Sequence, residues 1–286
     1  DFLLERDKPM PYANVRMIVM DLDDTLLNDA VQISPANQAA IARARAAGLT
    51  IVLASGRPFP AMIGYADLLH LAQGGYVISY NGAYVTDWSN RETLFETCLS
   101  KLECDLLVDT AHAQGVLMQT YIEGAIVTEQ MNPYSQLEAT LTGMPIELVA
   151  NLKSVVQGKV PKVLMLAEPD KIKTLQADLS KTLGGQFMIS ISKPVFLEFT
   201  NSAVDKSRGI DVICAKLGID KADVMAIGDS YNDLTMLRDC GVGVAMGNAP
   251  DDIKAIANVV TTDCAEDGVA AMIDRVLASQ STAHQS

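Results

Sequence analysis

Three acidic side chains directly follow an apolar run of four residues near the start of the sequence. The run Met17-Ile18-Val19-Met20 has the composition of a buried strand, and Asp21-Leu22-Asp23-Asp24-Thr25 comes after it. Buried carboxylates are costly unless a cation or hydrogen bonds compensate them. Side chains alternate along an extended segment, so Asp21 and Asp23 project from one side of it. Such a pair suits a hard metal ion and a phosphoryl group, although an Asp-rich turn that ends the strand explains this cluster equally well.

A second apolar run also ends in acid. Val224-Met225-Ala226-Ile227 is followed by Gly228-Asp229, and then by Asn232-Asp233 on the first turn of an expected helix. Open α/β sheets bind ligands at the carboxyl ends of their strands, near the switch in strand order. Two strands that end in acidic residues and lie side by side there would form one cation site. A shared functional site therefore explains both acidic clusters better than two unrelated turns do.

Two weaker signals fit the same site. The expected strand Thr50–Ala54 ends in Ser55-Gly56, whose hydroxyl and backbone N–H are good donors for a phosphate oxygen, although the same residues make ordinary turns. Lys206 precedes the helical stretch 210–217. A single Lys is usually a surface residue, so its assignment depends on the other motifs.

Together these motifs resemble the haloacid dehalogenase superfamily of phosphohydrolases, most closely its Cof-type branch, with a large cap inserted between the second and third motifs. The resemblance implies neighbouring strands for Asp21 and Asp229, with the strand of Ser55 on the other side of the first. Two positions depart from the family pattern, because Asp24 and Ser207 stand where Gly is common.

The resemblance also implies a role for each motif residue. Asp21 is expected to be the nucleophile of a covalent aspartyl-phosphate, and Asp23 the general acid and base. Mg²⁺ is expected to be held by Asp21, the backbone carbonyl of Asp23, and Asp229. Asp233 is expected to orient Asn232 or Lys206. The phosphate is expected to be bound by the backbone N–H groups of Leu22 and Gly56. The side chains of Ser55, Lys206 and Asn232 are expected to bind it as well.

The pattern along the chain predicts an α/β fold: a doubly wound parallel sheet, Rossmann-like, interrupted by an α+β cap. We expect the core at 15–82 and 203–279, the cap at 83–202, and tails at 1–14 and 280–286. A long helix is expected at 91–113, a hairpin of strands 116–121 and 125–129 around Gly124, and a closing helix at 268–277. The cap is expected to select the substrate, through residues that the sequence does not identify.

Composition narrows the function. The 22 basic and 35 acidic residues give a net charge of −13, which disfavours nucleic acid and leaves phosphate attraction to local groups. No apolar run approaches the ~20 residues of a membrane span. Residues 1–14 lack a signal-peptide pattern. Five scattered cysteines favour reduced thiols in a cytoplasmic protein. We expect a monomer or a small homo-oligomer.

The sequence therefore predicts a Mg²⁺-dependent phosphatase acting on a small phosphorylated metabolite such as a sugar phosphate. A phosphomutase with the same aspartyl-phosphate chemistry is the main alternative, and a non-catalytic module that binds phosphorylated metabolites is another. Asn81 and Asn248 each follow an expected core strand, and each is either a turn residue or a pocket residue.

Overall fold

Two units, each built around its own sheet, make up the part of the chain that the computed structural model describes, residues 12–283. The core unit takes in the described residues up to Gly56, Met62–Phe95, and those from Asp205 onward. The inserted unit consists of Arg57–Ala61 and Glu96–Val204. Most of the predicted tail at 1–14, and the last three residues of the other predicted tail, lie outside the described residues.

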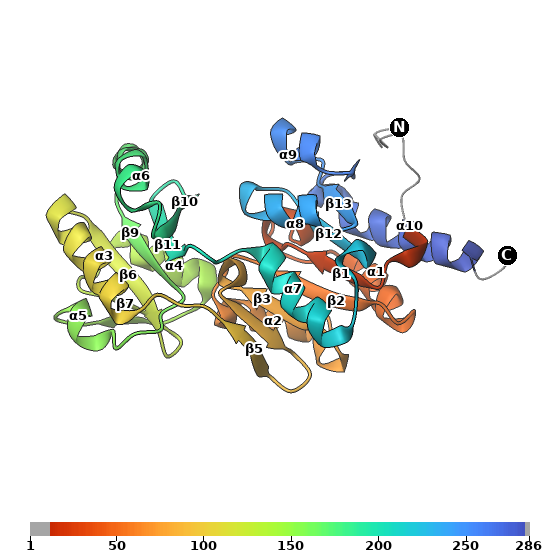
Figure 1. Cartoon of the computed structure of the whole chain (residues 1–286), viewed down its shortest axis with the longest axis horizontal. Coiled ribbons are helices and arrows are strands. Elements are labelled where there is room, and N and C mark those ends of the chain that lie inside the picture. Colours follow the sequence, from red (N-terminus) through yellow and green to blue (C-terminus); the bar gives the residue numbers. More distant parts are fainter. Residues whose placement is uncertain (1–11, 284–286) are drawn as a thin grey trace. The chain divides into compact units, whose positions relative to one another are not determined.

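The core unit contains an eight-stranded sheet with β1, Met17–Met20, near its middle (Figure 1). The strand order is β14-β13-β12-β1-β2-β3-β4-β5, and β1 pairs in parallel with both β12 and β2. The chain therefore passes from β1 outward through β2 and β3, and returns to the other side of β1 as β12. The bounds are Thr50–Ala54 for β2, Tyr76–Ser79 for β3, Tyr84–Asp87 for β4, Glu92–Glu96 for β5, Val224–Gly228 for β12, Val242–Ala245 for β13 and Val259–Val260 for β14.

Helices cover both faces of this sheet. Met17 and Val19 share a buried cluster with Ile210 and Ile213 of α7, while the alternate residues Ile18 and Met20 are fully buried on the opposite face. The absence of alternation between buried and exposed residues is typical of parallel strands covered on both sides. The helices are α1 Pro35–Ala46, α2 Phe59–Leu68, α7 Lys206–Leu217, α8 Leu234–Asp239, α9 Asp251–Ile256 and α10 Gly268–Ala283. The predicted doubly wound parallel sheet is confirmed.

Local sequence sets where the main helices of the core unit begin. Ser34 caps α1 by accepting a hydrogen bond from Asn37 N (3.0 Å), and Pro35 takes the first helical position. Asp205 caps α7 in the same way, accepting from Ser207 N (2.6 Å). Lys206 is consequently the first residue of α7, at the carboxyl edge of the sheet.

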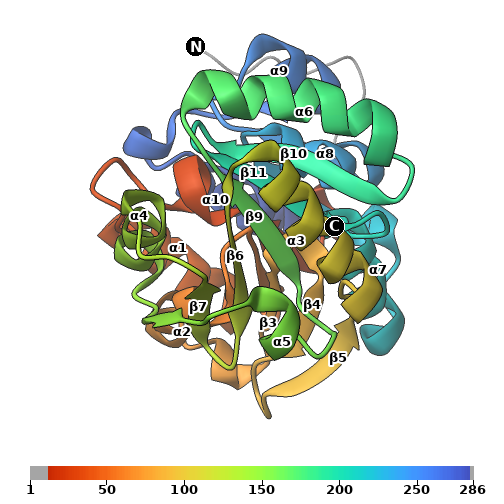
Figure 2. The same cartoon turned by 90° about the vertical axis from the view of Figure 1, so that its left-hand side faces the viewer.

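The inserted unit has a six-stranded sheet of order β10-β11-β9-β6-β7-β8, antiparallel except for the pair β7 and β8. Figure 2 shows α3 and α6 lying over one face of it, where their apolar residues share a core with the strands. The predicted hairpin is present, with positive φ at Glu123 and Gly124 between β6 and β7. The strands are β6 Leu117–Ile122, β7 Ala125–Thr128, β8 Ile146–Leu148, β9 Lys162–Leu166, β10 Phe187–Lys193 and β11 Phe196–Asn201. The helices are α3 Lys101–Gln114, α4 Pro133–Thr142, α5 Leu152–Val155 and α6 Pro169–Leu183.

The predicted long helix at 91–113 is wrong in its first third. Glu92–Glu96 forms β5, an edge strand of the core sheet, with Leu94 and Phe95 packed against the core cluster. The helix begins at Lys101, because Ser100 and Glu103 form a capping box that stops it from extending further back. The core unit consequently reaches Phe95, beyond the expected boundary at residue 82.

The sequence analysis also missed elements in 130–158 and ended the last helix too early. Asn132 caps α4 by accepting from Ser135 N (2.8 Å), and β8 and α5 follow. The last helix, α10, continues through Ala283, past the start of the predicted tail at residue 280. Gln280 Nε2 donates to Val15 O (2.7 Å), which ties this last turn to the start of the core unit.

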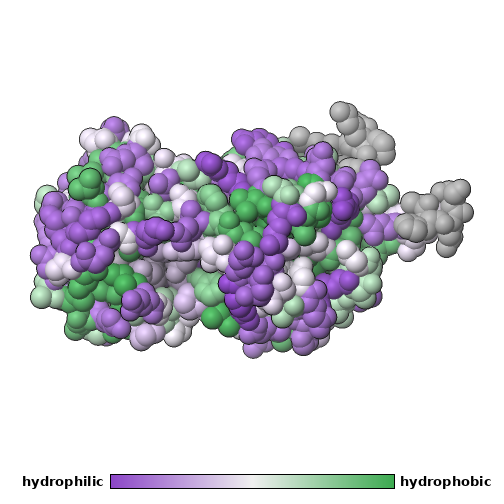
Figure 3. Space-filling view, turned by 60° about the horizontal axis from the view of Figure 1, so that its bottom comes forward, coloured by the Kyte–Doolittle hydropathy of each residue, from purple (hydrophilic) through white to green (hydrophobic). Residues whose placement is uncertain are grey.

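Hydrophilic residues cover most of the face seen in Figure 3, and hydrophobic residues gather in a few areas of it. Large exposed apolar side chains include Leu102 on α3 and Leu137 and Leu141 on α4. Among the described residues, no helix is both long and apolar enough to cross a membrane.

Candidate active site

Asp21 lies at the carboxyl end of β1, and its carboxylate contacts Lys206. The Asp21 backbone N–H donates to Ile227 O of β12 (3.0 Å), which continues the pairing of the two strands as far as the site. Lys206 Nζ donates to Asp21 Oδ1 (2.5 Å) and to Asp233 Oδ1 (2.6 Å). Lys206 is fully buried and Asp21 is 4% exposed. A buried Lys between two carboxylates is an ion-pair network and differs from the surface residue that a single Lys usually is.

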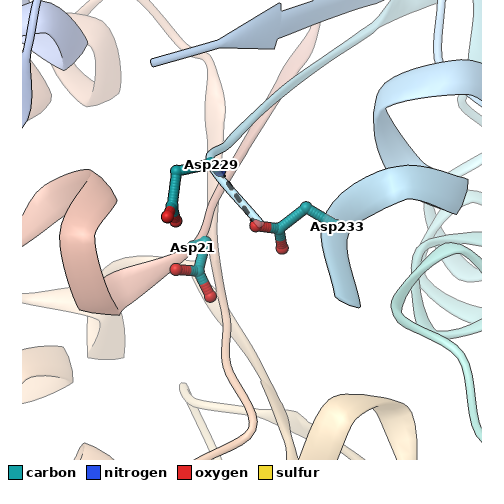
Figure 4. A group of neighbouring side chains, drawn as sticks. All are labelled: Asp21, Asp229 and Asp233. Carbon is teal, nitrogen blue, oxygen red and sulfur yellow. Dashed lines mark hydrogen bonds between the residues drawn. The ribbon is translucent and has the colours of Figure 1, made fainter. Parts of the chain in front are cut away.

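Three carboxylates meet at this edge of the sheet, from Asp21, Asp229 and Asp233 (Figure 4). One oxygen of each lies within 4.8 Å of the others, so all three can reach a common cation. Asp233 Oδ2 accepts from the backbone N–H groups of Asp229 (3.0 Å) and Ser230 (3.1 Å). Buried Thr25 donates from Oγ1 to Asp229 Oδ1 (2.9 Å). Each carboxylate is thereby held by at least one neighbouring donor.

The electrostatics of the cluster call for more positive charge than Lys206 supplies. The pKa of Asp229 is raised to about 7, chiefly by burial and next by Asp233, against the opposing effect of the hydrogen bond from Thr25. Burial also raises the pKa of Asp21 well above its ordinary value, with Lys206 opposing this effect and Asp233 and Asp229 adding to it. Burial lowers the pKa of Lys206, but Asp21 and Asp233 outweigh it and the pKa is raised overall. Three carboxylates against one ammonium leave two negative charges, which a divalent cation would balance.

A cavity of about 610 Å³ is lined in part by Asp229, one of the three carboxylates of the cluster. Asp24, Asp29, Asp263 and Glu266 also line it, which makes its field attractive to positive ions. Asn248, at its wall, donates from Nδ2 to Asp24 O (2.7 Å) and accepts from Cys264 N (3.1 Å). The oxygen-only donor set and the acidic cavity fit a hard divalent ion.

Neutral donors lie on the neighbouring strand ends. Ser55 is buried at the end of β2, where its N–H donates to Ile78 O of β3 (2.9 Å). Asn232 is exposed, and its Nδ2 donates to Asn81 Oδ1 (3.0 Å). Gly56 lies against the same Asn81 side chain. Asn81, which the sequence left open between a turn residue and a pocket residue, therefore contacts two expected phosphate-binding positions.

Asp23 and Leu22 follow Asp21 in a tight loop. Leu22 is fully buried and Asp23 is half-buried, and Leu27 N closes the loop by donating to Leu22 O (2.8 Å). The side chain of Asp23 is not part of the three-carboxylate group found among the described residues. Asp233 is part of that group, although the sequence analysis gave it only an orienting role. Its place four residues after Asp229, on the first turn of the helix that follows β12, was the available signal.

Both departures from the family pattern have a structural explanation. Asp24 adopts φ 57°, a left-handed conformation that Asp tolerates better than most residues, and Asn248 binds its carbonyl. Ser207 is buried, donates to Asp239 Oδ2 (2.9 Å) and accepts from Lys221 Nζ (2.6 Å). The polar side chain is thus satisfied where Gly is common.

A lysine–carboxylate site at the switch point of a doubly wound sheet, with an α+β unit inserted in the chain, defines the class of the haloacid dehalogenase-like hydrolases. This chain belongs to that family, whose model matches residues 18–273. A solved haloacid dehalogenase-like hydrolase from Bacteroides thetaiotaomicron has a TM-score of 0.86 and 35% identity, covering 92% of this chain and 99% of that one. The protein YxeH of Bacillus subtilis (strain 168) is 31% identical over 265 residues, 92% of this chain and 98% of its own length. The 5-amino-6-(5-phospho-D-ribitylamino)uracil phosphatase YcsE of the same organism is 28% identical over 262 residues, 91% of this chain and 95% of its own length.

These likenesses confirm the expected family and the expected enzyme class, a phosphatase of the haloacid dehalogenase type. The expected neighbours of β1 are also confirmed, because β12, which leads to Asp229, and β2, which leads to Ser55, pair with it on opposite sides.

Proposed function

We propose that the chain is a Mg²⁺-dependent phosphatase that hydrolyses a small phosphate monoester through an aspartyl-phosphate formed on Asp21. The observation that carries the proposal is the contact of Asp21 with Lys206 beside Asp229 and Asp233, in a cluster with two uncompensated negative charges. A cluster of this kind is stable only with a cation or protons, and phosphoryl transfer depends mainly on such positioning and charge balance.

Mg²⁺ would be held by the carboxylates of Asp21 and Asp229, together with the backbone carbonyl of Asp23, and the carboxylate of Asp233 is within reach. When bound, the ion supplies positive charge that stabilises the negative charge of the transferring phosphoryl group. Thr25 holds Asp229 for this role through its hydrogen bond.

Asp21 provides the attacking oxygen. Lys206 binds Oδ1 of Asp21 at 2.5 Å and so fixes the plane of the carboxylate. Asp233 in turn fixes Lys206, because its Oδ1 accepts from the same ammonium. The bond from an Asp21 oxygen to phosphorus forms as the bond from phosphorus to the leaving oxygen breaks. Water later attacks the phosphorus of this acyl phosphate, which releases inorganic phosphate and restores the Asp21 carboxylate.

Asp23 provides the proton. In the first step it donates a proton to the leaving oxygen, and in the second it takes one from the attacking water. Its half-buried position, two residues after the nucleophile, is consistent with access to both. Lys206, Ser55, Asn232 and the backbone N–H groups of Leu22 and Gly56 would bind the phosphate oxygens.

The substrate that we propose is a sugar phosphate or a similar small metabolite. The acidic protein, with its net charge of −13, repels polyanions, so a phosphate must be drawn in by local positive charge. The relative YcsE is by name a phosphatase of a small ribityl phosphate, which supports this class of substrate. A phosphomutase would use the same residues but return the phosphoryl group to its sugar.

The test is release of inorganic phosphate from a panel of phosphorylated metabolites with Mg²⁺, for the wild type and for Asp21→Asn. We expect turnover in the wild type and none in Asp21→Asn, with the fold retained by circular dichroism. Asp24→Asn is the matched control in the same loop and should keep its activity, because Asn also tolerates a positive φ.

Wild-type activity in Asp21→Asn would remove the nucleophile from the proposal. Isomerised sugar phosphate in place of free phosphate would favour the phosphomutase. Tight binding of phosphometabolites with no turnover of any would favour a binding module.

A further inference from the structure

Three consecutive residues with positive φ follow β3 at the edge of the sheet that carries the site. Tyr80, Asn81 and Gly82 have φ of 51°, 58° and 107°. A bulky residue such as Tyr seldom adopts this conformation, and strained backbone of this kind persists only where its surroundings hold it in place. The surroundings of this segment are the loops that carry the proposed phosphate-binding groups.

Asn81 contacts two of these loops. Its backbone N–H donates to Ser55 O (2.9 Å), and its Oδ1 accepts from Asn232 Nδ2 (3.0 Å). A Cβ atom placed on Gly56 would lie 3.0 Å from Asn81 Nδ2, so the Asn81 side chain packs directly on the Gly56 backbone. One side chain thus joins the loop after β2 to the loop after β12, and its contact with Asn232 spans 151 residues of sequence.

Gly82 brings the same segment against the start of α7. A Cβ atom on Gly82 would lie 2.3 Å from Asp205 O, so only glycine fits there. Asp205 caps α7 and precedes Lys206, and it accepts a further hydrogen bond from Thr235 Oγ1 (2.7 Å). The segment Tyr80–Gly82 is therefore packed against the loops that carry Gly56 and Asn232 and against the residue before Lys206.

We propose that Asn81 is a positioning residue for phosphate: it orients the amide of Asn232 and supports the Ser55-Gly56 backbone. Its acceptor Oδ1 binds one N–H of the Asn232 amide and thereby fixes where the rest of that amide points. This inference rests on the proposed function, since it assigns Asn232 and Gly56 to phosphate binding. Loss of the Asn81 amide should weaken phosphate binding by roughly two- to tenfold, the worth of one neutral hydrogen bond.

A simpler role is that Asn81 only tolerates its left-handed backbone conformation, as Asn often does in turns. Two substitutions separate the roles. Asn81→Gly removes the amide but suits a φ of 58°, whereas Asn81→Ala removes the amide and adds strain. A positioning role predicts a similar loss of phosphate affinity in both variants, and a purely conformational role predicts a loss in Asn81→Ala alone.

The measurement is the dissociation constant of inorganic phosphate with saturating Mg²⁺, by calorimetry, together with KM and kcat on an active phosphate ester. Each variant is also made in an Asn232→Ala background. Thermal unfolding reports whether the fold is kept, and Asn90→Gly, in the exposed turn between β4 and β5, is the control for introducing glycine elsewhere. Because phosphate binding needs no turnover, the inference is tested even if the proposed hydrolysis fails.

We expect Asn81→Gly to weaken phosphate binding and raise KM with little change in unfolding, and to have a clearly smaller effect once Asn232 is Ala, when only the support of the Ser55-Gly56 backbone is left to lose. Unchanged phosphate affinity in Asn81→Gly would overturn the inference. So would a loss that is as large in the Asn232→Ala background as in the wild type, because Asn81 would then not act through Asn232.

Discussion

Replacing Thr25 by Val tests how the structure keeps Asp229 ready for a cation. Thr25 is fully buried, and its Oγ1 donates to Asp229 Oδ1 at 2.9 Å. Val has nearly the same shape but no hydroxyl, so Thr25→Val deletes this hydrogen bond and leaves the surrounding packing almost unchanged. The pKa of Asp229 is about 7, raised mainly by burial and Asp233, and the hydrogen bond from Thr25 keeps it from being higher.

The size of the effect follows from the strength of the lost bond. A hydrogen bond to a charged group is worth about 1.5–3 kcal/mol, so its loss should raise the pKa of Asp229 further and shift its proton equilibrium roughly 10- to 100-fold toward the neutral form. At pH 7 the ionised fraction of Asp229 then falls from about half to roughly 1–10%. Mg²⁺ must displace the proton, so it should bind the variant roughly 5- to 50-fold more weakly at pH 7.

The pH dependence distinguishes this reasoning from general damage to the site. The hydrogen bond stabilises the free and the metal-bound carboxylate alike, so its loss acts through the competing proton. The gap in Mg²⁺ affinity should therefore shrink to roughly twofold or less by pH 9. At that pH Asp229 is almost fully ionised in the wild type and at least about half ionised in Thr25→Val.

Calorimetric titration with Mg²⁺ between pH 6 and pH 9 measures the gap. Thr25→Ser keeps the hydroxyl and is the matched control, with an affinity close to that of the wild type. A gap that stays constant across the pH range would refute the reasoning, since the loss would then come from altered packing and not from proton competition. An affinity for Mg²⁺ equal to that of the wild type at pH 7 would refute it as well.

Three further predictions concern the same site. Lys206→Met should destabilise the metal-free protein by about 3–5 kcal/mol in urea unfolding, because Asp21 and Asp233 are left buried without a cation. The loss should be smaller with Mg²⁺ present. An unchanged unfolding midpoint would contradict the ion-pair network. Without metal, the free energy of unfolding should fall by up to about 4 kcal/mol as the pH rises from about 4 to 7. The reason is that Asp229 has a higher pKa in the folded than in the unfolded protein, and so binds its proton more tightly in the native state. Mg²⁺ should reverse this fall, and a rise in the free energy of unfolding over the interval would show that other groups dominate. Asp23→Ala should slow alkyl phosphates far more than aryl phosphates, whose leaving groups need little protonation, and equal losses in kcat/KM on both would remove Asp23 as the general acid.

Sequence patterns were sufficient where a short apolar run ended in an acidic side chain. Apolar runs ending in Asp21 and Asp229 marked two parallel strands, and the structure pairs those strands side by side with matched residues. Where two patterns were locally similar, the sequence misled. Glu92–Glu96 is a mixture of charged and apolar residues that fits the start of a helix as well as an edge strand, and only pairing within the core sheet decided in favour of the strand.

By itself, the sequence determined which side chains stand at the ends of strands and therefore which chemistry the fold can bring to one edge. Periodicity and adjacency along the chain are local properties, and they identify strands, caps and turn residues without knowledge of their partners. The tertiary structure alone decided which of these groups touch. Lys206 contacts Asp21 across 185 residues, Asp233 joins the two other carboxylates, and Asn81 binds Asn232. Such contacts depend on the order of strands in the sheet and on the depth at which each loop is buried, and no short stretch of sequence contains that information.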